Sequence, residues 1–237
     1  MLFLLGLTGV GKSTAVAALQ NSKVPLTLLP NRRTLTDAFI VPEIQRAAGQ
    51  PVGQVSDRLE RFALTQRYRE AHPGGMTYAL VQYLNTHPYS EGKLLLFDNL
   101  RALGEVRAAT ETFPKARFVL LDAPPLVRLV RLVGRHDRFD QVAATRLENT
   151  SFVEQLLALG GLEAVFDPYE VARLEARGVP EADLLKAVQI IAGERQHYDM
   201  DAAATYLHQT QSAESFLALN TADLSPDEVR ARLQAWL

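Results

Sequence analysis

The sequence predicts an α/β fold in which helices flank a parallel sheet of five strands. Short apolar blocks recur along the chain, each block is continuous instead of alternating with polar residues, and segments of helical period separate the blocks. Continuous apolar blocks are typical of strands that are covered on both faces, as in a parallel sheet. The alternation of strand and helix then favours a doubly wound arrangement.

Five strands are expected, and three helix starts can be identified between and after them. The strands cover Leu2–Leu5, Val24–Leu29, Leu94–Phe97, Phe118–Leu121 and Phe216–Leu219. Ser13 and Thr14 open a helix over Ala15–Gln20, and Pro124 and Pro125 suit the first turn of a helix over Leu126–Val133. Ser225-Pro-Asp-Glu228 forms a capping box before the last helix.

Two stretches are longer than a minimal alternation of strand and helix requires. Thr36 to Leu84 has helical character, with breaks near 51–53 and 73–75, and so has Phe139 to Gln211. We expect a core of residues 1–138 and 213–237 that carries a helical insertion over about 36–86. Residues 139–212 then form a second helical insertion or a subdomain associated with a lid.

The composition excludes several classes of function. The 237 residues have a net charge of −2 and include no cysteine, which excludes disulfides, thiolate zinc sites and cysteine nucleophiles. The small net charge gives no general attraction to nucleic acid or to acidic membranes. No apolar run approaches the roughly 20 residues that span a bilayer. We therefore expect a cytoplasmic protein without a membrane partner.

The residues Gly6 to Ser13 match the pattern G-x-x-x-x-G-K-[ST] between an apolar strand and a helix. Glycines allow backbone N–H groups to turn toward an anion, and the N-terminus of the next helix points at the same place. Lys12 can reach β- and γ-phosphates, and the Ser13 hydroxyl can bind Mg²⁺. The predicted cofactors are ATP and Mg²⁺. The predicted nucleotide-binding residues are Gly6, Thr8, Gly9, Val10, Gly11, Lys12, Ser13 and Thr14.

Two classes of nucleotide-binding protein are disfavoured by missing motifs. A GTPase needs D-x-x-G and N-K-x-D motifs, but Asp98-Asn-Leu-Arg101 lacks the glycine and Asn220-Thr-Ala-Asp223 lacks the lysine. A transporter ATPase needs L-S-G-G-Q, which the sequence does not contain.

A row of arginines follows the fourth predicted strand. Arg128, Arg131, Arg135 and Arg138 recur at intervals of three and four residues, which places them along one face of a helix. Such a row is either a solvated basic face or a set of guanidinium groups that close over a polyphosphate. On the second interpretation, Arg128, Arg131 and Arg135 are catalytic together with Lys12.

The segment Leu121 to Arg135, with the sequence LDAPPLVRLVRLVGR, resembles the strand-to-lid segment of nucleoside and nucleotide kinases, such as dephospho-CoA and adenylate kinases. The segment Leu217 to Val229 is similar to the last strand and helix of those kinases. The resemblance covers roughly 1–30, 90–138 and 214–237. It implies the strand order 2-3-1-4-5 and transfer of the γ-phosphoryl group of Mg-ATP to a small acceptor, such as a nucleoside, a nucleotide or a related metabolite.

The acceptor side has several candidate residues. Asp98 follows a predicted central strand, where it could hold Mg²⁺ together with Ser13, act as the general base, or merely cap the next helix. Asp37 is the alternative base. Candidate substrate-binding residues are Arg32, Arg33, Asp37, Arg58, Arg67 and Arg101, for each of which a salt-bridged helix surface is the competing interpretation.

Two other functions remain open. A polynucleotide-end kinase would need a basic channel lined by Arg32, Arg33, Arg58 and Arg61, although the net charge does not favour nucleic acid as a partner. A nucleotide-dependent switch or assembly ATPase would use hydrolysis to move the second helical insertion and would have no small acceptor. That insertion could also form a homodimer or bind a protein partner.

Overall fold

A parallel sheet of five strands forms the centre of the computed structural model, which describes residues 1–56, 58–89, 92–133, 150–159 and 165–237. The side chains of residues 58, 59 and 62 lie outside this description. The strands are β1 (Leu2–Leu5), β2 (Leu26–Leu28), β3 (Leu94–Leu100), β4 (Arg117–Asp122) and β5 (Phe216–Asn220). They lie in the order β2-β3-β1-β4-β5 and every neighbouring pair is parallel. The predicted α/β class and strand order are therefore confirmed.

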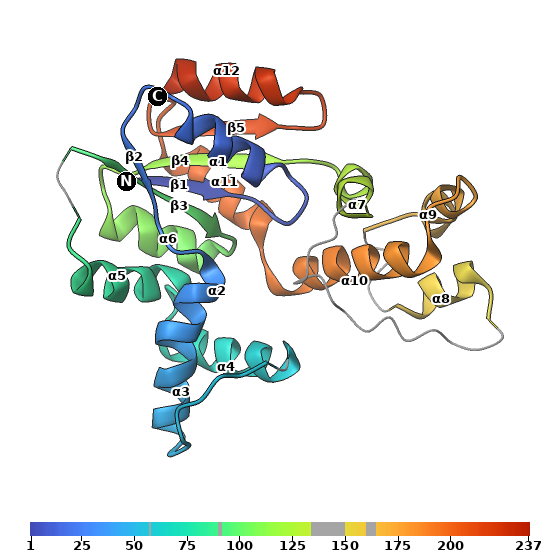
Figure 1. The fold of residues 1–237 in the computed structure, drawn as a ribbon, viewed down its shortest axis with the longest axis horizontal. Helices are drawn as coiled ribbons and strands as arrows, with labels where there is room; N and C mark the ends of the chain where they lie inside the picture. The colour runs from blue at the N-terminus through green and yellow to red at the C-terminus, as the bar shows by residue number, and fades with distance from the viewer. Residues whose placement is uncertain (57, 90–91, 134–149, 160–164) are drawn as a thin grey trace.

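The helices lie between the strands and in two long stretches beside the sheet (Figure 1). The first five are α1 (Lys12–Gln20), α2 (Arg32–Leu35), the π-helix η1 (Thr36–Ile40), α3 (Val41–Ala47) and α4 (Arg58–Ala71). The next four are α5 (Met76–Thr86), α6 (Leu103–Thr112), α7 (Pro125–Val133) and α8 (Phe152–Ala158). The last four are α9 (Pro168–Glu175), α10 (Glu181–His197), α11 (Met200–Thr210) and α12 (Pro226–Trp236).

Both faces of the sheet are buried, and successive side chains of β1 point alternately into two different cores. Leu2 and Leu4 pack with residues of α1 and α12 in one core. Phe3 packs with residues of α5, α6 and α11 in the other, and its ring stacks on Phe118 with 5.3 Å between centroids. The continuous apolar blocks of the sequence are thus explained by burial on both faces.

A third core joins the second helical stretch to α7. Leu129 and Leu132 of α7 pack with buried residues of α8, α9 and α10, among them Leu156, Val171 and Leu184. In Figure 1, α8, α9 and α10 lie beside the sheet and next to α7. The same helix therefore carries apolar residues that bind this stretch and arginines that face elsewhere.

Three local predictions need correction. The strand predicted at Val24–Leu29 is limited to Leu26–Leu28, and β3 continues to Leu100, so Asp98 lies inside a strand and does not cap the next helix. The first helix begins at Lys12 with Gly11 as its N-cap, which places Ser13 and Thr14 in the first turn. The predicted capping box of Ser225 and Glu228 is confirmed at the start of α12.

Of the predicted arginine row, Arg128 and Arg131 belong to α7, whereas Arg135 and Arg138 lie outside the described residues. Among the described helices, none combines the length and the apolar character that crossing a membrane requires.

Candidate functional site

The loop from Gly6 to Ser13 connects the central strand β1 to α1, and its glycines adopt positive φ angles. The φ angles of Gly6, Gly9 and Gly11 are 141°, 86° and 91°. A Cβ atom on Gly6 would lie 2.5 Å from the carbonyl oxygen of Leu121, and one on Gly9 would lie 3.0 Å from that of Arg128. Glycine is therefore needed at both positions, for the backbone angle and for the close approach of β4 and α7.

The ammonium group of Lys12 crosses the inside of this loop. Its Nζ atom donates to the carbonyl oxygens of Gly6 at 2.7 Å and Leu7 at 2.8 Å. Burial, together with the positive charge of Arg101, lowers the pKa of Lys12 to about 7. In this state the lysine binds carbonyl groups of its own loop, and a polyanion in the loop would both replace these partners and restore the charge.

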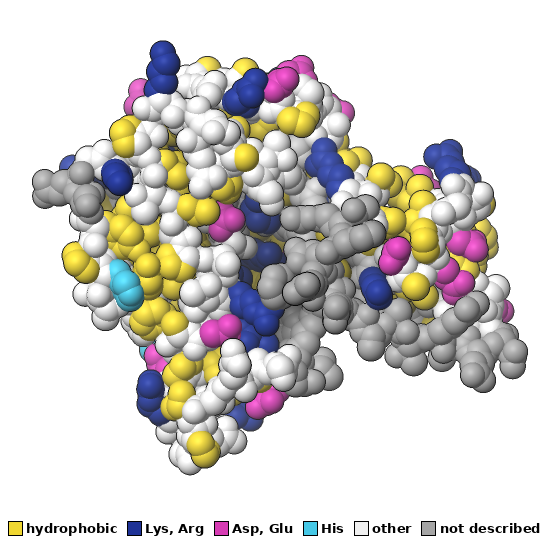
Figure 2. Space-filling model, viewed as in Figure 1, with side chains coloured by type: hydrophobic (Ala, Val, Ile, Leu, Met, Phe, Trp, Pro, Cys, Tyr) yellow, Lys and Arg dark blue, Asp and Glu magenta, His cyan; other side chains and the backbone are white. Residues whose placement is uncertain are grey.

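A cavity of about 710 Å³ opens directly on the loop. Its walls come from the loop and α1, from the carboxyl end of β3, and from the segment between β5 and α12. The residues are Thr8, Gly9, Gly11, Lys12, Ser13, Thr14, Asn31, Asp98, Asn99, Arg101, Arg131, Thr221, Leu224, Pro226 and Val229. Figure 2 shows Lys and Arg side chains gathered at the middle of one face of the molecule. The cavity lies at the carboxyl edge of the parallel sheet, where open α/β sheets bind ligands.

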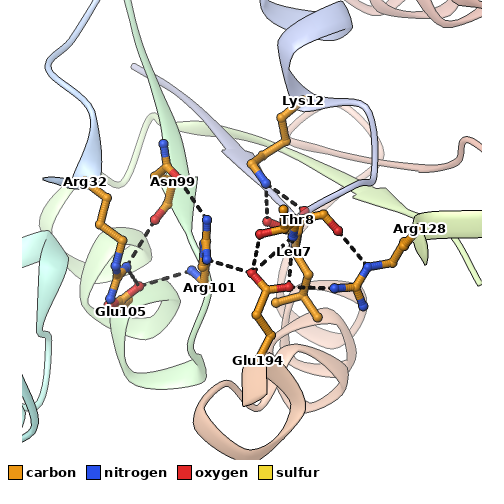
Figure 3. Close-up of polar contacts among 10 residues, drawn as sticks. Leu7, Thr8, Lys12, Arg32, Asn99, Arg101, Glu105, Arg128 and Glu194 are labelled. Atoms are coloured by element: carbon orange, nitrogen blue, oxygen red, sulfur yellow. Dashed lines mark hydrogen bonds and ion pairs between the residues drawn. The ribbon is translucent and has the colours of Figure 1, made fainter. Parts of the chain in front are cut away.

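Glu194 of α10 contacts the loop from the second helical stretch (Figure 3). Its carboxylate accepts hydrogen bonds from the N–H group of Thr8 at 3.0 Å and from the Thr8 hydroxyl. It also forms ion pairs with Arg101 at 2.8 Å and Arg128 at 2.6 Å. Only 7% of the Glu194 side chain is exposed. Within the loop, the N–H and hydroxyl groups of Thr8 therefore already bind one carboxylate.

Two arginines of α7 bind carbonyl groups of the same loop. The Nε atom of Arg128 donates to the Thr8 carbonyl at 2.8 Å, and Arg131 donates to the Gly9 carbonyl at 3.2 Å. Burial lowers the pKa of Arg128, although Glu194 opposes the shift. Arg131 lines the cavity, whereas Arg128 does not. These two of the three predicted catalytic arginines therefore bind the outside of the loop, and of the two only Arg131 reaches the cavity.

Thr221 joins the last strand to the loop. Its buried hydroxyl donates to the Val10 carbonyl at 2.9 Å and accepts from Arg131 at 2.9 Å. Its backbone N–H donates to the carbonyl of Asp122 at 2.8 Å. This single threonine fixes the distance between β5, the loop and α7.

Asp98 faces the cavity that also contains Ser13. The amide of Asn99 donates to Asp98 at 2.6 Å, so one carboxylate oxygen has a neighbouring donor. A carboxylate and a hydroxyl that line one cavity are oxygen groups of the kind that Mg²⁺ takes as ligands when phosphates supply the others. Asp98 is thus placed for either of its two predicted roles, metal ligand or base.

Three of the six predicted substrate residues, Arg32, Arg33 and Asp37, are bound to neighbouring side chains. Arg32 forms two hydrogen bonds with Glu105, at 2.8 and 2.6 Å, and Asp37 pairs with Arg61 and, at 3.9 Å, with Arg33. Arg67 is exposed on α4, and the side chain of Arg58 lies outside the description. Of this set only Arg101 lines the cavity. A role of the others in substrate binding stays a prediction.

Sequence reasoning missed Glu194, Thr221 and Asn99. One signal for Glu194 was available: it continues the buried stripe of Leu184, Val188 and Ile191 at intervals of four and three residues. A carboxylate on a buried helix face needs a cationic partner, so the spacing alone marks it as paired. No local pattern marks Thr221, because its partners Val10, Asp122 and Arg131 come from distant parts of the chain. Asn99 bonds its neighbour Asp98, and nothing in the spacing shows that both residues line the cavity.

The strand order, and a glycine-rich loop that joins the central strand to a helix over a cavity, define a P-loop nucleotide-binding fold. No family model and no curated protein matches the chain. A solved sugar kinase from Janibacter sp. HTCC2649 is similar at 15% identity and a TM-score of 0.47, over 99% of this chain and 92% of that one. A sulfotransferase from Alicyclobacillus acidocaldarius is similar at 12% identity and a TM-score of 0.44, over 99% and 79%. Similarities this low carry no argument about activity.

Proposed function

We propose that the protein is a kinase that transfers the γ-phosphoryl group of Mg-ATP to a small acceptor. The observation that carries this proposal is the cavity of about 710 Å³. It joins a phosphate-binding loop on one wall to a separate polar wall at the end of β3. A nucleotide triphosphate on the loop would direct its terminal phosphate at whatever binds the polar wall. Positioning two reactants in this way supplies much of the rate in phosphoryl transfer.

The nucleotide would lie between the loop and the start of α12. Lys12 would exchange the Gly6 and Leu7 carbonyls for phosphate oxygens, and Ser13 would hold Mg²⁺. Leu224, Pro226 and Val229 form an apolar part of the cavity wall, which suits the face of a purine ring.

The acceptor would lie against Asn31, Asp98, Asn99 and Arg101. Two amides, a carboxylate and a guanidinium group can bind hydroxyl and phosphate groups, so a phosphorylated or polyhydroxylated metabolite fits this wall. Asp98 would accept the proton of an acceptor hydroxyl or hold Mg²⁺ through water. Arg101 and Arg131 would neutralise charge on the transferred group.

The test is a screen for transfer of a labelled γ-phosphate to nucleosides, nucleotides, sugars, coenzyme precursors and oligonucleotide ends. We expect one class of small acceptor to be labelled, and Lys12→Ala to lower the rate by a factor of about 10² to 10³, as loss of a key charge in a transfer site does. Lys23→Ala, an exposed lysine just after α1, is the matched control and should be neutral. Equal rates for wild type and Lys12→Ala would contradict the proposal.

The second candidate is a nucleotide-dependent switch ATPase. The contact between Glu194 and the loop favours it, since a change in the loop would act directly on α10 of the second helical stretch. It predicts hydrolysis of ATP without any acceptor and no labelled product. No similar observation favours a polynucleotide-end kinase, because Arg32 and Arg61 of its expected basic channel pair with Glu105 and Asp37.

A further inference from the structure

The carboxylate of Glu194 has no acceptor capacity left. One oxygen accepts from the Thr8 hydroxyl and from Arg101, the other accepts from Arg128, and both lie within 3.2 Å of the Thr8 backbone nitrogen. A carboxylate has about four lone-pair positions. These donors fill them, so Glu194 in this state cannot accept a proton from a substrate. It resembles a bound ligand instead of a catalytic base.

Glu194 and Arg128 do not line the cavity, but two of the residues that donate to the Glu194 carboxylate do. Thr8 and Arg101 line the cavity. Thr8 belongs to the loop, and Arg101 belongs to the polar wall proposed to bind the acceptor, called the acceptor wall below (Asn31, Asp98, Asn99 and Arg101). In a transfer reaction the phosphate nearest the acceptor is the terminal one. Thr8 of the loop and Arg101 of the acceptor wall would therefore bind the terminal phosphate.

A terminal phosphate and the Glu194 carboxylate cannot both use these donors. Each donor would have to bind the carboxylate and the phosphate at once. The two negative charges would also lie a few ångströms apart in a partly buried site, where they repel strongly. The carboxylate would have to leave before a triphosphate could bind fully. A diphosphate, one group shorter, would leave it in place.

The end of α10 is anchored next to this site, which keeps Glu194 at the loop. The ring of Tyr198 lies 5.4 Å from the Arg32 guanidinium and 5.5 Å from that of Arg101. Asp199 accepts a hydrogen bond from the backbone N–H of Leu103 at the start of α6, at 2.8 Å. Residues 194–199 are therefore fixed to the acceptor wall, and Glu194 is held ready at the loop at little entropic cost.

We infer that Glu194 is an internal competitor for the terminal phosphate and sets the preference between di- and triphosphates. The inference rests on the proposed nucleotide binding and specifies how that same site is regulated. When a triphosphate binds, its terminal group takes over Thr8 and Arg101, the two donors that line the cavity, and the carboxylate is expelled. The apparent affinity for triphosphates is then lowered by the fraction of molecules in which Glu194 occupies the site.

The test is a calorimetric titration of wild type, Glu194→Gln and Lys12→Ala with Mg-ADP and with the Mg²⁺ complex of the β,γ-imido analogue of ATP. Glutamine keeps the shape and part of the hydrogen bonding but removes the charge. We expect Glu194→Gln to bind the imido analogue about ten-fold more tightly and ADP within two-fold of wild type. Glu170→Gln, an exposed position on α9, is the matched control and should change neither affinity.

A second measurement covers the case in which removing the charge lowers stability. Tripolyphosphate should raise the melting temperature of Glu194→Ala more than that of wild type, because it replaces the missing anion beside Arg101, which lines the cavity.

Three outcomes overturn the inference. The first is an equal change in affinity for both nucleotides in Glu194→Gln, and the second is weaker binding of the imido analogue. The third is an equal effect of tripolyphosphate on wild type and Glu194→Ala. If Lys12→Ala abolishes ADP binding while Glu194→Gln is neutral, this inference fails and the proposed function stands. If wild type binds neither nucleotide, both fail.

Discussion

Two buried carboxylates, Glu105 and Glu194, bind arginines in neighbouring parts of the structure (Figure 3). Both are less than one tenth exposed, at 1% and 7%, and both pair with guanidinium groups at 2.6 Å. Glu105 also accepts from the backbone N–H groups of Arg101 and Met76. Arg32 holds the pKa of the Glu105 carboxyl below its usual range despite burial, which would raise it. The two sites look alike as clusters of charge.

The partners distinguish the two carboxylates. Glu105 binds α2, the residue that follows β3 and the start of α5, and none of these groups belongs to the loop from Gly6 to Ser13. Glu194 binds the loop itself and two arginines, of which Arg101 lines the cavity and could also bind a phosphate. A buried ion pair is thus structural when no ligand competes for its donors and regulatory when one does. We expect mutations in the first cluster to change stability and mutations in the second to change binding.

The largest effect is expected for Glu105→Ala. It leaves the partly buried Arg32 charged and without its carboxylate partner, so the free energy of unfolding in urea should fall by about 3 to 5 kcal/mol. Glu111→Ala, an exposed position on the same helix, is the control and should stay within about 0.5 kcal/mol of wild type. If Glu105→Ala were as stable as this control, the contrast between the two clusters would be broken.

Arg101 and Arg32 sharpen the comparison as a pair. The Arg101 side chain pairs with Glu194, although its backbone N–H group donates to Glu105. Arg101→Ala should therefore lower phosphoryl transfer by a factor of about 10² to 10³, as removal of an oxyanion donor does. Arg32→Ala should instead lower the free energy of unfolding by about 3 to 5 kcal/mol. Steady-state rates and urea melts of both variants decide this, and an identical profile for the two would contradict it.

The pH dependence of nucleotide binding tests the role of Lys12 in the loop that Glu194 contacts. The pKa of Lys12 in the empty protein is about 7, since burial penalises its charged form. Bound phosphates favour that form and raise the pKa, so binding takes up a proton above pH 7. The affinity should be highest below pH 7 and fall about ten-fold per pH unit above it, until the pKa of the bound state is reached. Titration calorimetry in buffers of different ionisation enthalpy should detect the proton, and Lys12→Met should remove the dependence.

The smallest effect is expected where a carboxylate is exposed. Glu228 and Ser225 cap α12 reciprocally at the surface, so water can replace either partner. Ser225→Ala should lower the free energy of unfolding by about 1 kcal/mol, as loss of a single N-cap does. A loss as large as that of Glu105→Ala would mean that burial does not explain the difference between these carboxylates.

The sequence predicted those parts of the molecule that are local in the chain. Five apolar blocks predicted the strands, because burial on both faces leaves a continuous apolar signal. The spacing of residues from Gly6 to Ser13 predicted the loop. The length of β3 was underestimated because Asp98 and Asn99 interrupt its apolar block while they face the cavity. Glu194 was missed because its role depends on a loop at the other end of the chain. Arg32 and Asp37 were expected at the substrate, but their partners Glu105 and Arg61 were not visible from spacing.

The loop is short, yet the contacts that hold it span most of the chain. Partners of residues 8 to 10 lie 120, 122, 186 and 211 positions away, on α7, α10 and the segment after β5. Such distant contacts close large loops and form late in folding. A nascent or truncated chain that already contains the complete glycine motif would still lack the surroundings that shape it. If the protein binds ATP as proposed, capture of nucleotide would report that the whole chain has folded, and immobilised ATP would retain the mature protein selectively.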